Sequence, residues 1–83
     1  MIISKKICIG VLGLGYIGLP LSFEFSKFFK VIGYDINKNR VAELLKGKDR
    51  TKEFKKKEKF KQKKLFFTNN SNDLEICNVF IVT

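Results

Sequence analysis

A glycine-rich turn between two apolar runs constrains this chain more than any other feature of its sequence. The run from Ile7 to Leu12 is typical of a buried strand, and it leads into Gly13-Leu14-Gly15-Tyr16-Ile17-Gly18, which has the spacing GxGxxG. A helical pattern follows, and a second apolar run, Val31 to Tyr34, ends at Asp35. Strand, glycine turn, helix, strand and acid, in that order, predict the first βαβ unit of a dinucleotide-binding fold.

Each glycine of the turn has its own expected function. Gly13 permits a sharp turn, because a residue without a side chain adopts positive φ at little steric cost. Gly15 lets the backbone approach a pyrophosphate, and Gly18 lets the new helix pack closely on the strand. The helix start then offers N–H groups and a positive dipole end to the phosphates. The alternative is a purely structural turn, but the strand and helix on either side favour the dinucleotide interpretation.

An acidic residue at the end of the second strand indicates which dinucleotide is bound. Asp35 follows Gly15 by about 20 residues, the offset at which a carboxylate meets a hydroxyl of the adenosine ribose. A carboxylate at this position repels the 2′-phosphate of NADP. The predicted cofactor is therefore NAD.

The helix after the turn has an apolar face predicted from the spacing of its residues. That face consists of Ile17, Leu21, Phe25 and Phe28, with Ser22, Glu24 and Lys27 pointing to water. Pro20 is tolerated because it falls in the first turn, where its missing N–H costs little. The pattern predicts a helix lying against a sheet.

A second helix is predicted directly after Asp35. Asn37 is its candidate N-cap, and Gly47 supplies its end. Its apolar stripe consists of Val41, Leu44 and Leu45. Arg40 lies one turn into this helix, near the place of an adenosine ribose, and on spacing alone a solvated helix arginine is an equal alternative.

The last third of the chain completes a four-stranded pattern. Leu65 to Thr68 predicts a third strand, Asp73 to Ile76 one helical turn, and Val79 to Val82 a fourth strand, apolar throughout and so expected to be covered on both faces. The fold class is α/β, a Rossmann-like three-layer half-fold with a parallel sheet of about four strands in the order 3-2-1-4. Residues 1–83 are thus expected to form a partial dinucleotide-binding domain, whose open sheet edge invites self-association.

Charge is distributed unevenly along the chain. The net charge is +9, from 17 basic and 8 acidic residues, and most of it lies between Lys46 and Lys64. A solvated, lysine-coated helix is the preferred interpretation. The alternative is a basic protein that uses Lys46–Lys64 to bind polyanions.

Residues for chemistry beyond binding are scarce. The chain has no histidine, and its cysteines, Cys8 and Cys77, are interpreted as structural thiols with no case for a disulfide. No catalytic residue and no metal ligand is predicted. The apolar run after Lys5 and Lys6 superficially imitates a signal peptide, but it is rich in glycine and lacks a cleavage site. We expect a cytoplasmic protein without membrane or sequence-specific nucleic-acid partners.

Several segments resemble one enzyme family. GLGYIGLPLSFEF, VIGYDINKNRVAEL, GKDRTKEF and NVFIVT are similar to the N-terminal NAD-binding domain of the UDP-glucose/GDP-mannose dehydrogenase family. The likeness is greatest to the branch that oxidises UDP-N-acetylhexosamines, and it is weakest over residues 55–64. It implies oxidation of the C6 alcohol of a nucleotide sugar to a carboxylate in two NAD-dependent steps, through a cysteine-linked thioester.

The resemblance also implies what individual residues do. Gly13 to Gly18 would hold the pyrophosphate, Asp35 the adenosine ribose and Arg40 the adenosine end, while Thr83 would begin a loop toward the nicotinamide. The family's catalytic residues and sugar-binding domain lie further downstream, so this portion alone is expected to be inactive, with a nucleotide sugar as a partner only of the full-length enzyme. Another NAD-dependent dehydrogenase of the hydroxyacid or phosphogluconate type is the alternative.

Overall fold

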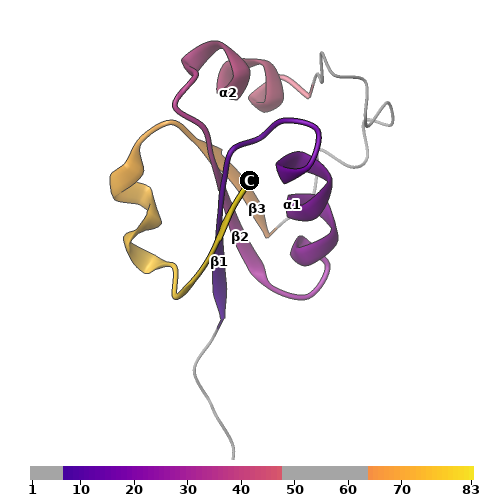
Figure 1. Cartoon of the computed structure of the whole chain (residues 1–83), viewed down its shortest axis with the longest axis vertical. Helices are drawn as coiled ribbons and strands as arrows, with labels where there is room; N and C mark the ends of the chain where they lie inside the picture. Colours follow the sequence, from indigo (N-terminus) through magenta and orange to yellow (C-terminus); the bar gives the residue numbers. More distant parts are fainter. Residues whose placement is uncertain (1–6, 48–63) are drawn as a thin grey trace, which may run out of the picture.

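The computed structural model describes residues 7–47 and 64–83 (Figure 1). Its elements, in chain order, are β1 (Cys8–Leu12), α1 (Gly18–Ser26), β2 (Lys30–Tyr34), α2 (Lys38–Leu45), β3 (Leu65–Thr68), the 3₁₀ helix η2 (Ser71–Ile76) and β4 (Val79–Val82). Every predicted element of this part of the chain is present. The predicted lysine-coated helix lies almost wholly outside the described residues.

The four strands form one parallel sheet in the order β3-β2-β1-β4. The register sets Gly10 of β1 beside Ile32 of β2 on one side and beside Phe80 of β4 on the other. This confirms the predicted order 3-2-1-4. All carboxyl ends of the strands therefore meet at one end of the sheet, where ligands bind in open α/β folds.

Two apolar clusters, one on each face of the sheet, make the fold three-layered. Alternate β1 side chains enter different clusters, because successive side chains of a strand point to opposite faces. Ile9 and Val11 pack with Leu19 and Phe23 of α1, whereas Cys8 packs with residues of η2 and its flanks. Figure 1 shows the arrangement, with α1 on one side of the sheet and η2 on the other.

The predicted sheet-facing side of α1 is wrong. Ile17 and Phe28 are 65% and 70% exposed, while Leu21 and Phe25 are only half-buried. The sheet is contacted instead by a neighbouring face of the helix, on which Gly18, Ser22 and Ser26 each follow a predicted core residue by one position. Its buried members are Gly18, Leu19, Ser22, Phe23 and Ser26.

Ser22 is fully buried instead of pointing to water, and hydrogen bonds explain why. Its Oγ donates to the carbonyl oxygen of Gly18 at 2.7 Å, and Ser26 Oγ donates to that of Phe23 at 2.7 Å. A buried hydroxyl with a partner costs little, and its small size lets the helix lie close to the strands. The apolar pattern alone does not reveal this, because it counts serine as polar.

The ends of α2 match the prediction. Asn37 Oδ1 accepts hydrogen bonds from the backbone N–H groups of Asn39 and Arg40, as an N-cap does. Gly47 has φ of 77° and ends the helix. Val41 and Leu44 are buried, but Leu45 is 66% exposed and does not belong to the core.

Strand β4 differs from the prediction in its coverage. Val79, Phe80 and Val82 are exposed, so the strand is not covered on both faces within the part of the chain that the structure describes. It pairs with β1 on one side only and forms one edge of the described sheet, while β3 forms the other. The apolar side chains of β4 therefore form a surface that the described residues leave uncovered.

Candidate dinucleotide-binding site

The turn from Gly13 to Gly18 lies at the carboxyl end of β1, beside the start of α2 and the last residue of the chain (Figure 1). Gly13 has φ of +101°, a conformation that L-residues with side chains rarely adopt. Its N–H donates to the carbonyl oxygen of Tyr34 at 2.8 Å, which ties the turn to the end of β2. The sharp turn assigned to this glycine is therefore present.

The other two glycines of the motif differ in the space around them. A Cβ at Gly18 would lie 1.6 Å from the carbonyl oxygen of Gly13, so this position must be glycine for the turn to close. A Cβ at Gly15 would meet no described atom within 4 Å. Gly15 thus presents bare backbone to open space, which is the geometry that a pyrophosphate requires.

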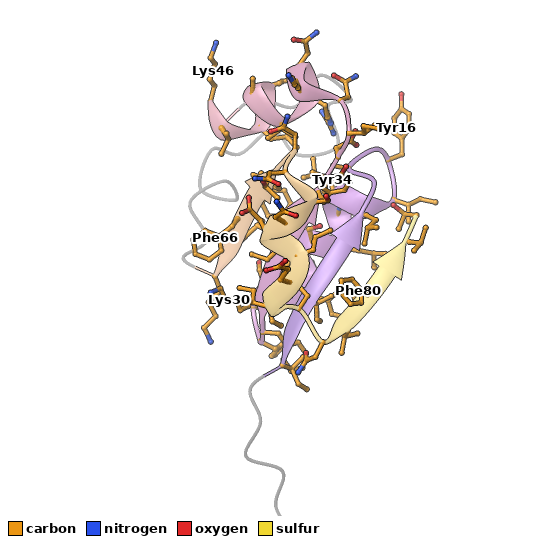
Figure 2. The ribbon with its side chains drawn as sticks, turned by 90° about the vertical axis from the view of Figure 1, so that its left-hand side faces the viewer. Tyr16, Lys30, Tyr34, Lys46, Phe66 and Phe80 are labelled. Carbon is orange, nitrogen blue, oxygen red and sulfur yellow. The ribbon has the colours of Figure 1, made fainter. Side chains whose placement is uncertain are left out.

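The N-terminus of α1 faces the same open space. Its N-cap is Ile17, and no described side chain caps the helix by a hydrogen bond. Tyr16 and Ile17 are 68% and 65% exposed, and Figure 2 shows Tyr16 projecting outward from the turn. N–H groups at an uncapped helix start are suited to an anion.

Asp35 lies directly against the glycine turn. Its Oδ2 accepts a hydrogen bond from the N–H of Leu14 at 2.9 Å, and its Oδ1 accepts one from the N–H of Asn37 at 2.9 Å. Both oxygens are thereby oriented before any ligand arrives. A carboxylate offers about four lone-pair sites, so it can still accept hydroxyl donors.

Arg40 also bonds to the turn, but from a buried position. Only 5% of the residue is exposed. Its Nε donates to the carbonyl oxygen of Leu14 at 2.6 Å, and its Nη1 pairs with Glu43 Oε1 at 3.3 Å. The alternative of a solvated helix arginine is therefore wrong: the side chain is directed into the protein, because a backbone carbonyl and a carboxylate are available there.

Thr83 holds the turn from the β4 side. Its N–H donates to the carbonyl oxygen of Leu12 at 2.9 Å, and its Oγ1 donates toward that of Gly13 at 2.9 Å. Asp35, Arg40 and Thr83 thus converge on the backbone of Gly13 and Leu14 from both sides. Leu14, which the sequence places in the predicted turn, forms two of these hydrogen bonds, with Asp35 and Arg40, through its backbone. The sequence could not reveal these bonds, because the side-chain type of Leu14 carries no signal for them.

Two surface cavities are lined by other residues than the glycine turn, Asp35 and Arg40. They measure about 590 and 470 Å³, and Lys30 and Phe66 line both of them. The smaller cavity extends to Thr68, whose carbonyl oxygen accepts a hydrogen bond from the N–H of Asp35 at 3.2 Å. No group of three or more acidic, cysteine or histidine side chains in the described ranges could hold a metal ion. No described helix is both long and apolar enough to span a bilayer.

The parallel sheet order, the glycine turn at its carboxyl end and the adjacent carboxylate together define a dinucleotide-binding domain of the Rossmann type. Residues 5–83 match the sequence profile of the UDP-glucose/GDP-mannose dehydrogenase family, NAD binding domain. The chain belongs to this family, at its NAD-binding domain, and the cofactor of that domain is NAD.

Individual relatives agree with this assignment. The chain is 51% identical over 79 residues to the UDP-N-acetyl-D-glucosamine 6-dehydrogenase of Pseudomonas aeruginosa. The aligned region covers 95% of this chain and 19% of that protein. It is 42% identical over 74 residues to Protein CapL of Staphylococcus aureus, covering 89% and 17%. The chain thus spans about a fifth of the length of the curated relatives it matches.

Solved structures show the same fold. A UDP-D-ManNAc dehydrogenase from Pyrococcus horikoshii superposes with a TM-score of 0.85 at 35% identity, over 93% of this chain and 20% of that one. The UDP-N-acetyl-mannosamine dehydrogenase Cap5O from Staphylococcus aureus superposes with a TM-score of 0.77 at 33% identity, over 92% and 19%. The expected resemblance to this family is confirmed.

Proposed function

We propose that residues 1–83 are a partial dinucleotide-binding domain whose glycine turn, Gly13 to Gly18, receives the pyrophosphate of NAD. Asp35 accepts hydrogen bonds from the adenosine ribose. Arg40 and Thr83 belong to the same site because both bond to the backbone of the turn. The observation that carries the proposal is the 2.9 Å hydrogen bond between Asp35 and Leu14, which joins the ribose-binding and phosphate-binding parts.

Titration of the 83-residue chain with NAD and NADP by calorimetry tests this proposal. We expect NAD to bind more tightly than NADP, because Asp35 repels a 2′-phosphate. Asp35→Ala should weaken NAD binding and reduce the preference. Glu24→Ala is the matched control, since it removes an exposed carboxylate from α1. Equal affinities of the wild-type chain for both dinucleotides would contradict the proposal.

We further propose that the whole protein oxidises the C6 alcohol of a nucleotide sugar to a carboxylate. Support comes from relatives that are UDP-N-acetyl-D-glucosamine and UDP-N-acetyl-D-mannosamine dehydrogenases. Bound NAD would supply the hydride acceptor. The described residues include no candidate for the nucleophilic cysteine, because Cys8 and Cys77 are both buried, with Cys8 at the opposite end of β1 from the turn. The 83-residue chain should therefore form no NADH when a UDP-sugar is added.

Two secondary proposals concern partners and location. The exposed β4 edge supports self-association of the chain through its open sheet. The NAD-binding family and the two free thiols support a cytoplasmic location, where thiols remain reduced.

The family assignment does not favour the hydroxyacid or phosphogluconate alternative. The polyanion-binding alternative stays a prediction, because residues 48–63 of the basic tract lie outside the described part. Binding of NAD and of RNA, each followed across a salt series, separates the two activities, since phosphate contacts to a lysine tract weaken steeply with salt.

A further inference from the structure

Two cysteines that lie 69 positions apart in the sequence come into contact in the fold. The Sγ atoms of Cys8 and Cys77 are 3.4 Å apart, and both residues are buried, at 6% and 9% exposed. Cys8 begins β1 and Cys77 lies between η2 and β4, at the end of the sheet opposite the glycine turn (Figure 1). The thiol pair therefore lies outside the candidate dinucleotide site.

Backbone hydrogen bonds hold the two thiols beside each other. The N–H of Cys8 donates to Asn78 Oδ1 at 2.9 Å, and the N–H of Asn78 donates to the carbonyl oxygen of Cys8 at 2.9 Å. The N–H of Cys77 donates to the carbonyl oxygen of Leu74 in η2 at 3.0 Å. Because both backbones are fixed at the contact, little entropy has to be lost when the sulfur atoms approach to a bonding distance of about 2 Å.

A surface cavity gives a small oxidant access to one thiol of the pair. Cys8 lines the larger cavity, of about 590 Å³, together with Lys30 and Lys64, whereas Cys77 is not among the described residues that line it. Burial and the contact with Cys8 raise the pKa of Cys77 to about 12, so this thiol stays protonated near neutral pH. Cys8 is therefore the sulfur that meets an oxidant first.

We propose that Cys8 and Cys77 form a redox modification site, at which a peroxide converts the thiol pair into a disulfide that fastens β4 to β1. The Cys8 sulfur attacks one peroxide oxygen and the O–O bond breaks. Cys8 becomes a sulfenic acid, while the other oxygen takes the thiol proton and leaves as water. The proposal does not depend on the function of the glycine turn.

The second step joins the two sulfur atoms. The Cys77 sulfur attacks the sulfur of Cys8, the S–S bond forms and the S–O bond breaks. The leaving oxygen takes the proton of Cys77 and departs as a second water. One hydrogen peroxide is thus reduced to two waters while two thiols are oxidised to one disulfide, which a dithiol reduces again.

The disulfide should stabilise the fold chiefly by constraining the unfolded chain. It closes a loop of 69 positions, and a longer closed loop removes more entropy from the unfolded state. It also ties down β4, which pairs with β1 on one side only. A transient disulfide in a reducing compartment is typical of a response to oxidants.

The 83-residue chain suits the test because it contains two cysteines, Cys8 and Cys77. The reduced chain is treated with hydrogen peroxide, and its intact mass and its peptides are measured without reduction. We expect a monomer that has lost two hydrogen atoms, and a peptide pair linked through both cysteines. Thiols left unreacted, oxygen added to Cys8 beside a free Cys77, or dimers linked by disulfides in place of this monomer would overturn the proposal.

Thermal melts of the same sample test the fastening of β4. The linked monomer should unfold about 10 °C above the reduced chain, and dithiothreitol should restore the original midpoint. An unchanged midpoint would overturn this role. Peroxide treatment in concentrated urea is the control, because the thiols are then no longer held together, and the linked monomer should form much more slowly. Equal rates with and without urea would show that the fold does not pair the thiols.

Two matched variants test the order of the steps. In Cys77→Ala the remaining thiol of Cys8 should gain oxygen under peroxide, because no second thiol displaces it. In Cys8→Ala the thiol of Cys77 should stay unmodified under the same conditions. Equal oxidation of the two variants would overturn the assignment of Cys8 as the first sulfur attacked. If either variant does not fold, the mass and melting of the wild-type chain still decide.

Discussion

Leu14 and the glycines around it show that a binding turn depends on which backbone atoms are held and which are left open. The backbone groups of Gly13 and Leu14 form hydrogen bonds with Tyr34, Asp35, Arg40 and Thr83. The side of Gly15 on which a side chain would stand faces open space instead. Because these hydrogen bonds already order Gly13 and Leu14 in the free chain, no free energy has to be spent on ordering them when a ligand binds, which is preorganisation. The open part is available to a phosphate.

Substitution by alanine should have different effects at Gly18, where a Cβ would clash, and at Gly15, where it would meet open space. Gly18→Ala should destabilise the chain by about 3 kcal/mol or more, because its Cβ would overlap the Gly13 carbonyl. Gly15→Ala should leave thermal unfolding nearly unchanged but weaken NAD binding, because its methyl group occupies the phosphate's approach. Thermal melts and NAD titrations of both variants check this. Equal stability losses would contradict the geometry.

The stability of the chain should depend on pH through the buried thiols of Cys8 and Cys77, which lie on the η2 face of the sheet. Burial, together with the Cys8 thiol 3.4 Å away, raises the pKa of Cys77 to about 12. In the unfolded chain this thiol titrates near 9, so between pH 9 and 12 the folded chain binds more protons and stability falls as pH rises. Cys77→Ala should show a shallower loss over this range in denaturant titrations. Identical pH slopes for the two proteins would refute the assignment.

At the scale of elements, the start of α2 links local capping to the site. Asn37→Ala should cost about 1 kcal/mol of unfolding free energy, because two helix N–H groups lose their acceptor. It should also weaken NAD binding, because α2 carries Arg40. Asn39→Ala is the control, as this exposed residue does not cap the helix. Urea denaturation of the two variants measures the difference, and equal losses would contradict the capping role.

Most elements could be predicted from the sequence, because strand runs, glycines and an N-cap are local signals. The sheet-facing side of α1 could not, since Ser22 and Ser26 are buried through hydrogen bonds to the helix backbone. The environment of Arg40 could not either, since it depends on a carbonyl of a distant turn. The spacing of Gly15 and Asp35 predicted that the acid lies close to the glycine turn, and the hydrogen bond from the N–H of Leu14 to Asp35 confirms this placement. The groups that orient Asp35 could not be predicted, because they are backbone N–H groups.

At the scale of the whole molecule, the sheet is asymmetric in its coverage. Its inner strands are buried between α1 and η2, while β4 exposes apolar side chains and an edge. Exposed apolar edges pair with other chains.

Self-association should therefore respond to charge at this edge. Val82→Lys, at a residue that is 79% exposed, should shift the sedimenting species of the 83-residue chain toward monomer. Leu45→Lys is the control, because it removes a comparably exposed apolar side chain from α2. A wild-type chain that sediments as a monomer at high concentration would contradict the proposed self-association.

The central place of β1 has a consequence for how the chain acquires its shape during synthesis. Strand β1 leaves the ribosome before the other described strands, and its neighbours in the sheet are β2 and β4. Its pairing therefore stays incomplete until nearly all the described residues have been made. Thr83, the third anchor of the turn, is made after the other two, Asp35 and Arg40. A nascent chain stalled before Thr83 has left the ribosome should be more open to proteolysis near the glycines than one stalled after it has left.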